Sequence, residues 1–105
     1  MEEKEIKIDS DHIKLLIQSG ECRLALAYVV KKFYEAMRIG LTDKGALSIS
    51  NYLFDEIIKK LPGETEESIC SSFILMAMEE EAMFFDVIKN ALLNIGMELM
   101  KNEEA

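Results

Sequence analysis

The chain has 105 residues, half of them apolar, and a net charge of −8. That length suits a single helical domain spanning residues 1–105, and the apolar half is enough for a core, which argues against a disordered chain. An acidic surface repels phosphate backbones and anionic lipid headgroups. The composition therefore disfavours proteins that bind nucleic acid or membranes through charge.

Targeting and membrane signals are missing from the sequence. The longest uninterrupted apolar stretch, residues 24–30, is far shorter than the roughly 20 residues that span a bilayer. The charged start, residues 1–5, has no apolar run of the kind a secretory signal needs. The two cysteines, Cys22 and Cys70, stand at no metal-binding or redox spacing, which predicts free buried thiols. We expect a cytoplasmic protein without contact to a membrane.

The first nine residues, 1–9, form a charged arm in which Ile6 and Ile8 flank Lys7. Alternation of apolar and polar residues is typical of a strand, but this stretch is too brief to stand alone as one. We expect the arm either to lack order or to pair with a second copy of itself.

Two helices are expected next. The first begins at Asp9 or Ser10, whose side chains suit an N-cap, and ends at Gly20, which adopts positive φ without strain. The second covers residues 21–39 and stops at Gly40. Because a long apolar run fills its first half, that half should be covered on several sides.

A third helix follows a cap at Thr42 or Asp43 and covers residues 46–61. The pair Pro62-Gly63 ends it, since proline cannot continue the hydrogen-bond ladder.

The last segment, residues 63–105, carries the whole net charge. It holds ten acids and two bases, whereas residues 1–62 hold ten of each. The acidic run Glu79–Glu81 interrupts the apolar pattern, so the segment is either one long helix or two. No capping residue stands at the junction, which favours one continuous helix. The expected fold is an all-α bundle of four helices, or five if the last segment divides.

The last segment is also apolar on more than one side. Phe84-Phe85 and Leu92-Leu93 are adjacent pairs that cannot both face one narrow seam. A short chain has little left to cover them, and a twofold homodimer is the commonest solution. The residues predicted for this interface are Met76, Met83, Phe84, Phe85, Ile88, Leu92, Ile95 and Leu99.

The acidic surface favours basic partners, either another protein or the basic residues of a second copy. In the second case the acidic helix of one copy would meet Lys31, Lys32, Arg38, Lys59 and Lys60 of the other.

The sequence shows no constellation of residues that would support catalysis, a metal ion or a cofactor. His12 is the sole histidine and is remote in sequence from Ser48, Ser50, Ser71 and Ser72, and no Gly-rich phosphate loop is present. The adjacent carboxylates of Glu79–Glu81 diverge around a helix and cannot converge on one cation. The predicted function is therefore a non-catalytic helical protein–protein interaction module that acts as a homo-oligomer.

An alternative function rests on residues 42–60, which read as a turn into a helix. Polar residues there, Ser48, Ser50, Asn51 and Tyr52, are types that meet phosphates or base edges, with Lys44, Lys59 and Lys60 as nearby cations. The alternative is a small regulator that contacts nucleic acid, although the net acidity of the chain argues against it.

Overall fold

The computed structural model describes the backbone of residues 6–104 and the side chains of residues 6–96. Residues 1–5 of the predicted charged arm lie outside the described residues. Every regular element in the described part is an α-helix: α1 (Ser10–Gln18), α2 (Cys22–Ala36), α3 (Asp43–Lys60), α4 (Glu66–Glu79) and α5 (Glu81–Glu104). The predicted all-α bundle is confirmed, in its five-helix form.

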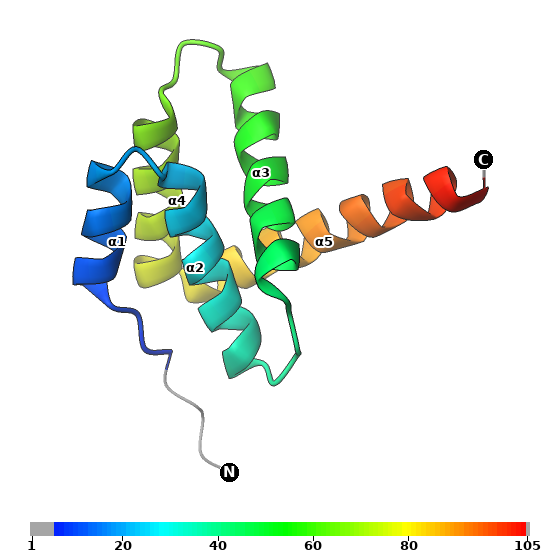
Figure 1. Cartoon of the computed structure of the whole chain (residues 1–105), viewed down its shortest axis with the longest axis horizontal. Coiled ribbons are helices and arrows are strands. Elements are labelled where there is room, and N and C mark those ends of the chain that lie inside the picture. Colours follow the sequence, from blue (N-terminus) through cyan, green and yellow to red (C-terminus); the bar gives the residue numbers. More distant parts are fainter. Residues whose placement is uncertain (1–5, 105) are drawn as a thin grey trace.

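Helix α2 is the central element of the bundle. α1, α3 and α4 pack around it, and α5 packs against α3 and α4 before its far end extends beyond them (Figure 1). Ala25, Leu26, Ala27 and Val29 point in different directions around α2 and are all buried, whereas Leu24 is 42% exposed. The prediction that the first half of this helix is covered on several sides is confirmed.

The N-caps predicted for the first and third helices are confirmed at Asp9 and Thr42, and Thr65 caps α4 in the same way. The Asp9 carboxylate accepts hydrogen bonds from the backbone N–H of Asp11 (3.0 Å) and of His12 (3.3 Å), which satisfies two donors that lack a partner within α1. The hydroxyl oxygens of Thr42 and Thr65 accept from the N–H groups three residues on, at 3.0 and 3.1 Å. Local capping chemistry therefore fixes where α1, α3 and α4 begin.

Helices α1 and α2 are each followed by a residue with a positive φ, a glycine after α1 and an arginine after α2. Gly20 ends α1 with a φ of 77°, as predicted. The prediction that α2 continues to residue 39 and stops at Gly40 is wrong, because α2 ends at Ala36 and Arg38 takes the left-handed position with a φ of 60°. The Ile39 N–H donates to the Tyr34 carbonyl at 3.0 Å, which closes the turn.

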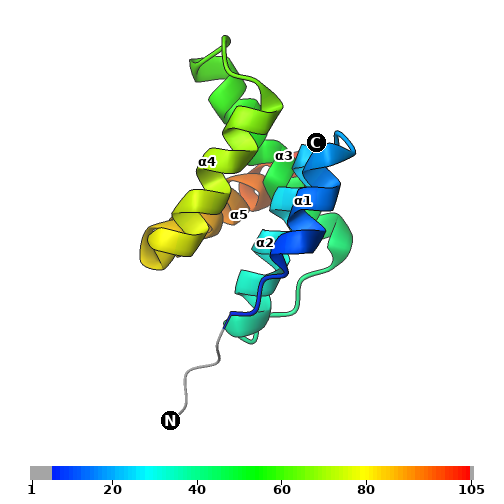
Figure 2. The ribbon, with the colours of Figure 1, turned by 90° about the vertical axis from the view of Figure 1, so that its left-hand side faces the viewer.

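The prediction of one continuous C-terminal helix is also wrong. The chain breaks at Glu80, with a φ of −134° and a ψ of 65°, and changes direction sharply between α4 and α5 (Figure 2). The break lets both helices reach the same core. Phe73 and Ala77 of α4 are buried there, and Phe84 of α5 packs edge-to-face on Phe33 with 4.7 Å between ring centroids.

Residues 6–9 lie extended along the bundle. Ile6 and Ile8 are half-buried and pack against the core, and the Asp9 N–H donates to the Tyr28 hydroxyl at 3.1 Å. Residues 6–9 of the predicted arm therefore pack on their own chain.

Candidate interaction surface

Arg23 holds the most connected polar cluster of the described chain. Its guanidinium lies 3.0 Å from the Asp55 carboxylate on α3 and 3.1 Å from the Glu66 carboxylate at the start of α4. It also donates to the Asn51 side-chain oxygen at 3.1 Å and stands 5.1 Å from the centre of the Phe54 ring. These contacts connect α2, α3 and α4, so the cluster stabilises the packing of three helices.

The polar residues at the centre of the 42–60 stretch are used within the chain. Ser50 is fully buried, and its hydroxyl donates to the Arg23 carbonyl at 2.6 Å. Asn51 accepts from Arg23, and the Tyr52 hydroxyl accepts from the Asn94 side chain at 2.9 Å. Ser48 is exposed, and its hydroxyl donates to the Lys44 carbonyl at 3.0 Å. All four polar side chains considered for nucleic acid therefore make hydrogen bonds within the chain.

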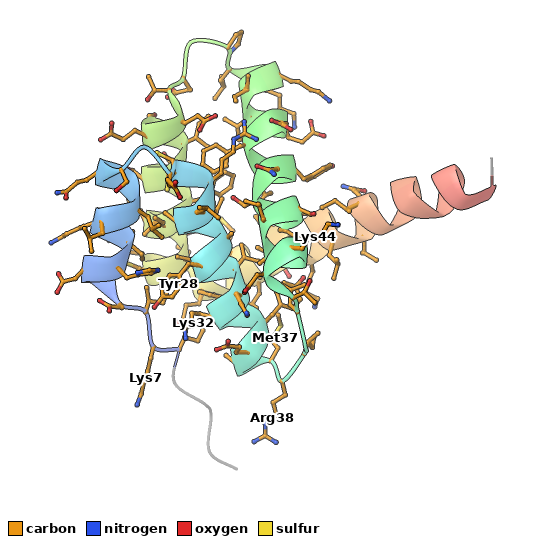
Figure 3. The ribbon with its side chains drawn as sticks, in the orientation of Figure 1. Lys7, Tyr28, Lys32, Met37, Arg38 and Lys44 are labelled. Atoms are coloured by element: carbon orange, nitrogen blue, oxygen red, sulfur yellow. The ribbon has the colours of Figure 1, made fainter. Side chains whose placement is uncertain are left out.

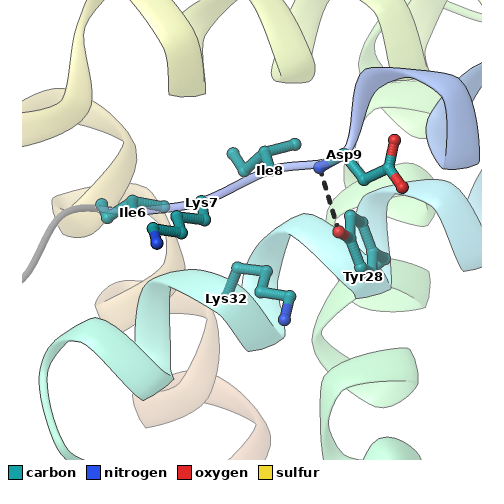
Figure 4. Close-up of a pocket in the computed structure, with 6 residues that line it drawn as sticks. All are labelled: Ile6, Lys7, Ile8, Asp9, Tyr28 and Lys32. Carbon is teal, nitrogen blue, oxygen red and sulfur yellow. Dashed lines mark hydrogen bonds between the residues drawn. The ribbon is translucent and has the colours of Figure 1, made fainter.

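An open hollow of about 530 Å³ lies where the extended N-terminal segment passes α2 (Figure 4). Lys7 and Lys32 line it together with Tyr28 and Asp9. The Tyr28 hydroxyl accepts from the Asp9 backbone, and the Lys32 ammonium stands 5.6 Å from the centre of the Tyr28 ring. Tyr28 thus contacts both Asp9 of the extended segment and Lys32 of its own helix.

The basic residues predicted to meet a second copy are spread over two ends of the bundle. Lys32 and Arg38 lie near Lys7 at the end where α2 runs into the loop before α3 (Figure 3). Several of the predicted cations already have partners. Lys31 pairs with Asp43, Lys32 lies 3.6 Å from the Glu35 carboxylate and Lys59 lies 4.0 Å from that of Glu56. Their contribution to any contact between copies is therefore limited to weak steering.

Seven of the eight residues predicted for the interface divide into three groups by exposure. Phe84 and Ile88 are fully buried within the chain, so they belong to its core and not to its surface. Met76, Phe85 and Ile95 are half-buried against that core. Met83 and Leu92 are exposed, and the side chain of Leu99 lies outside the described residues.

The middle of α5 presents an apolar surface with little charge. Leu92 is 40% exposed and Leu93 is 66% exposed. Residues 87–97 contain Lys89 as their single charged residue. Gly96 follows Leu92 by one turn, and a Cβ added there would meet nothing within 4 Å in the chain. We call Leu92, Leu93 and Gly96 the α5 patch.

Helix α4 has two apolar faces. Ile69, Cys70, Phe73 and Ala77 form the inner face and are buried. On the opposite side, Ser71, Ile74, Leu75 and Met78 recur at spacings of three and four, so they share one face. Leu75 is 56% and Met78 is 59% exposed, whereas Ile74 is half-buried. We call these four residues the α4 outer stripe.

The two cysteines are free and buried, as the sequence predicts. The Cys70 thiol donates to the Cys22 carbonyl at 3.3 Å and thereby links α4 to α2. Burial raises the pKa of Cys70 to about 12, with a smaller contribution from Cys22, and burial likewise raises the pKa of Cys22. Because the thiolate is the reactive form, both groups are poor nucleophiles in the folded chain.

The sequence analysis predicts that the last segment is apolar on more than one side, but it does not identify the α4 outer stripe. The available signal was that Leu75 and Met78 both point away from Phe73 on a helical projection. Gly96 lies inside α5, within the segment that the sequence predicts as helical.

Comparison with protein-family models, with curated proteins and with solved structures finds no significant match to this chain. Within the described part, no helix combines the length and apolarity needed to cross a bilayer. Across the described side chains, His, Cys, Asp and Glu residues form no group of three that could hold a metal ion.

Proposed function

We propose that this chain is a non-catalytic helical interaction module that assembles with a second copy of itself through the α5 patch. The observation that carries the proposal is the exposure of Leu92 and Leu93 on a helix whose far end extends beyond the bundle (Figure 1). Apolar side chains grouped on one helix gain free energy when a second surface covers them.

The charge of this region favours a second copy as the partner. In a twofold dimer the same residues lie on both sides of the interface, so a surface with many like charges opposes itself. Residues 87–97 avoid this repulsion because they include a single charge. Gly96 supports the same proposal, since a helix residue without a Cβ allows a second helix to approach closely.

The test is the mass of the chain in solution. Light scattering coupled to size-exclusion chromatography is expected to give twice the chain mass of 12.0 kDa. The double substitution Leu92→Asp with Leu93→Asp should reduce that mass to that of one chain, because it places carboxylates at an apolar contact. Both side chains are exposed, so the helical circular dichroism signal should stay unchanged.

Leu15→Asp supplies the matched control. Leu15 is 62% exposed on α1, far along the chain from the α5 patch, and its substitution should leave the dimer intact. A wild-type chain that runs as a monomer across the working concentration range would contradict the proposal. So would a dimer that survives the double substitution.

The alternative of nucleic-acid contact through residues 42–60 is not proposed. The side chains of Ser50, Asn51 and Tyr52 make hydrogen bonds within the chain. No feature of the described surface favours nucleic-acid binding over self-association.

A further inference from the structure

We propose that the α4 outer stripe is a second docking surface, and that it binds an amphipathic helix with basic flanks from another protein. The stripe comprises Ser71, Ile74, Leu75 and Met78, and lies on a different helix from the α5 patch. This inference does not depend on the proposed self-association.

The first step concerns shape and polarity. Leu75 and Met78 are each more than half exposed although they belong to a helix whose other face is also apolar. A helix that is apolar on two sides is normally covered on both. Met78 adds an unbranched, adaptable side chain, which suits a surface that meets another helix. The spacing of three and four residues is the spacing at which one helix packs along another.

The second step concerns the charge around the stripe. From Glu64 to Asp86 the chain holds seven acids and no base. Glu67 stands one turn before Ser71, and Glu79 stands one turn after Leu75, so exposed carboxylates bracket the stripe at both ends. Glu66 differs from these two, because it is paired with Arg23.

The bracketing acids disfavour a second copy as the occupant. If two copies paired this stripe antiparallel about a twofold axis, Glu67 of one chain would face Glu79 of the other. If they paired parallel, each acid would face its own counterpart. Either arrangement brings like charges together, which costs free energy at an interface. A helix that places lysine or arginine on both flanks of an apolar stripe matches the same surface in charge and polarity.

The probe for the test is a pair of synthetic helical peptides. Both carry leucines at positions i, i+3, i+4 and i+7, and one has lysine where the other has glutamate on the flanks. Isothermal titration calorimetry at low salt should show that the lysine peptide binds the full chain and that the glutamate peptide does not. Added salt should weaken the binding, since charge contributes to it.

The decisive variant is Leu75→Asp with Met78→Asp. It makes the chain more acidic, so binding by charge alone would strengthen. Loss of two apolar contacts should instead raise the dissociation constant of the lysine peptide by about tenfold or more. Leu15→Asp on α1 is the control and should bind the peptide as the wild type does. A second variant, Glu67→Gln with Glu79→Gln, should weaken binding while the stripe stays intact.

Three outcomes would overturn the proposal. The lysine peptide fails to bind, or it binds the Leu75→Asp, Met78→Asp variant as tightly as the wild type, or that variant lowers the mass of the chain in light scattering. The last result would assign the stripe to self-association. Because the α5 patch is tested by different substitutions, failure here is distinguishable from failure of the proposed dimer.

Discussion

Arg38 occupies a backbone conformation that favours glycine. Among the described residues it is the one non-glycine position with a positive φ, at 60°. Left-handed backbone costs an L-residue with a side chain about 1–2 kcal/mol. Gly20 closes α1 in the same conformation, at a φ of 77°, without that cost. The two helix ends therefore form a natural pair for measuring the strain.

Arg38→Gly is expected to raise the free energy of unfolding by about 0.5–1 kcal/mol, because glycine relieves the strain and loses part of the gain through its freer unfolded chain. Gly20→Ala should lower the free energy of unfolding by about 1 kcal/mol. No atom lies within 4 Å of a Cβ at residue 20, so that loss reports backbone strain alone. Urea denaturation followed by circular dichroism measures both changes.

Arg38→Ala is the control for this pair. It removes the same charge and side chain as Arg38→Gly but keeps the strained conformation, so its stability should stay close to that of the wild type. An equal gain from Arg38→Ala and Arg38→Gly would show that the arginine side chain, and not the backbone, carries the cost.

The sequence marks the N-caps of α1, α3 and α4 better than it marks the end of α2, for a physical reason. Asp9, Thr42 and Thr65 cap through hydrogen bonds to neighbours two or three residues away, and such contacts depend on local sequence. The end of α2 depends instead on tertiary structure. Met37 packs against the core, and the chain then turns at Arg38 although Gly40 stands two residues later.

At the scale of the helices, Arg23 is the residue that joins most elements. It lies on α2, pairs with Asp55 on α3 and Glu66 on α4, and remains 27% exposed. Asp55 and Glu66 are more exposed than Arg23, so water screens the two ion pairs and each is worth little alone. The planar guanidinium gains from meeting both carboxylates and Asn51 in one geometry.

Arg23→Lys is expected to lower the free energy of unfolding by about 1–2 kcal/mol, because one ammonium group cannot reach three partners on two helices. Lys59→Ala is the comparison. It removes a surface pair with Glu56 whose charged atoms are 4.0 Å apart, and should change stability by less than about 0.5 kcal/mol. Thermal and urea unfolding of both variants make the measurement.

If Arg23→Lys lowers the free energy of unfolding no more than Lys59→Ala does, the contact of Arg23 with three helices adds no more stability than an ordinary surface ion pair. The adjacent Ser50 hydroxyl bonds to the Arg23 carbonyl and not to its side chain, so this link persists in the variant and does not confuse the comparison.

The boundary between α4 and α5 shows what helical periodicity leaves undetermined. Phe73, Ala77, Phe84 and Ile88 share one side of a helical projection whether the helix is straight or broken. No proline or glycine marks Glu80. The break follows from packing, since α2 has 15 residues and is only about 22 Å long. If α4 and α5 were one straight helix, the apolar residues of its second half would lie beyond the end of α2 and outside the core.

At the scale of the whole molecule, the extent of the bundle along α5 decides which apolar residues of that helix remain exposed. Ile88 and Leu92 are one turn apart on α5, yet the first is fully buried and the second is 40% exposed. Sequence alone places both on one stripe and correctly predicts that the C-terminal segment has more apolar surface than one face can hide. Where the bundle ends along α5 depends on the length and tilt of α3 and α4, which no local pattern encodes.

Gly96 offers the sharpest test of the proposed dimer, because its substitution should act oppositely on the single chain and on the pair. Glycine inside a helix is about 1 kcal/mol less favourable than alanine, and nothing in the chain lies within 4 Å of a Cβ at this position. In the dissociated Leu92→Asp, Leu93→Asp background, Gly96→Ala should therefore raise the free energy of unfolding by about 0.5–1 kcal/mol.

In the chain without those aspartates, the added methyl group would instead stand where a second helix approaches. Sedimentation equilibrium is expected to show that Gly96→Ala raises the dimer dissociation constant by about tenfold, or roughly 1.4 kcal/mol. A dimer that is unchanged or tighter would mean that the partner helix does not approach at Gly96.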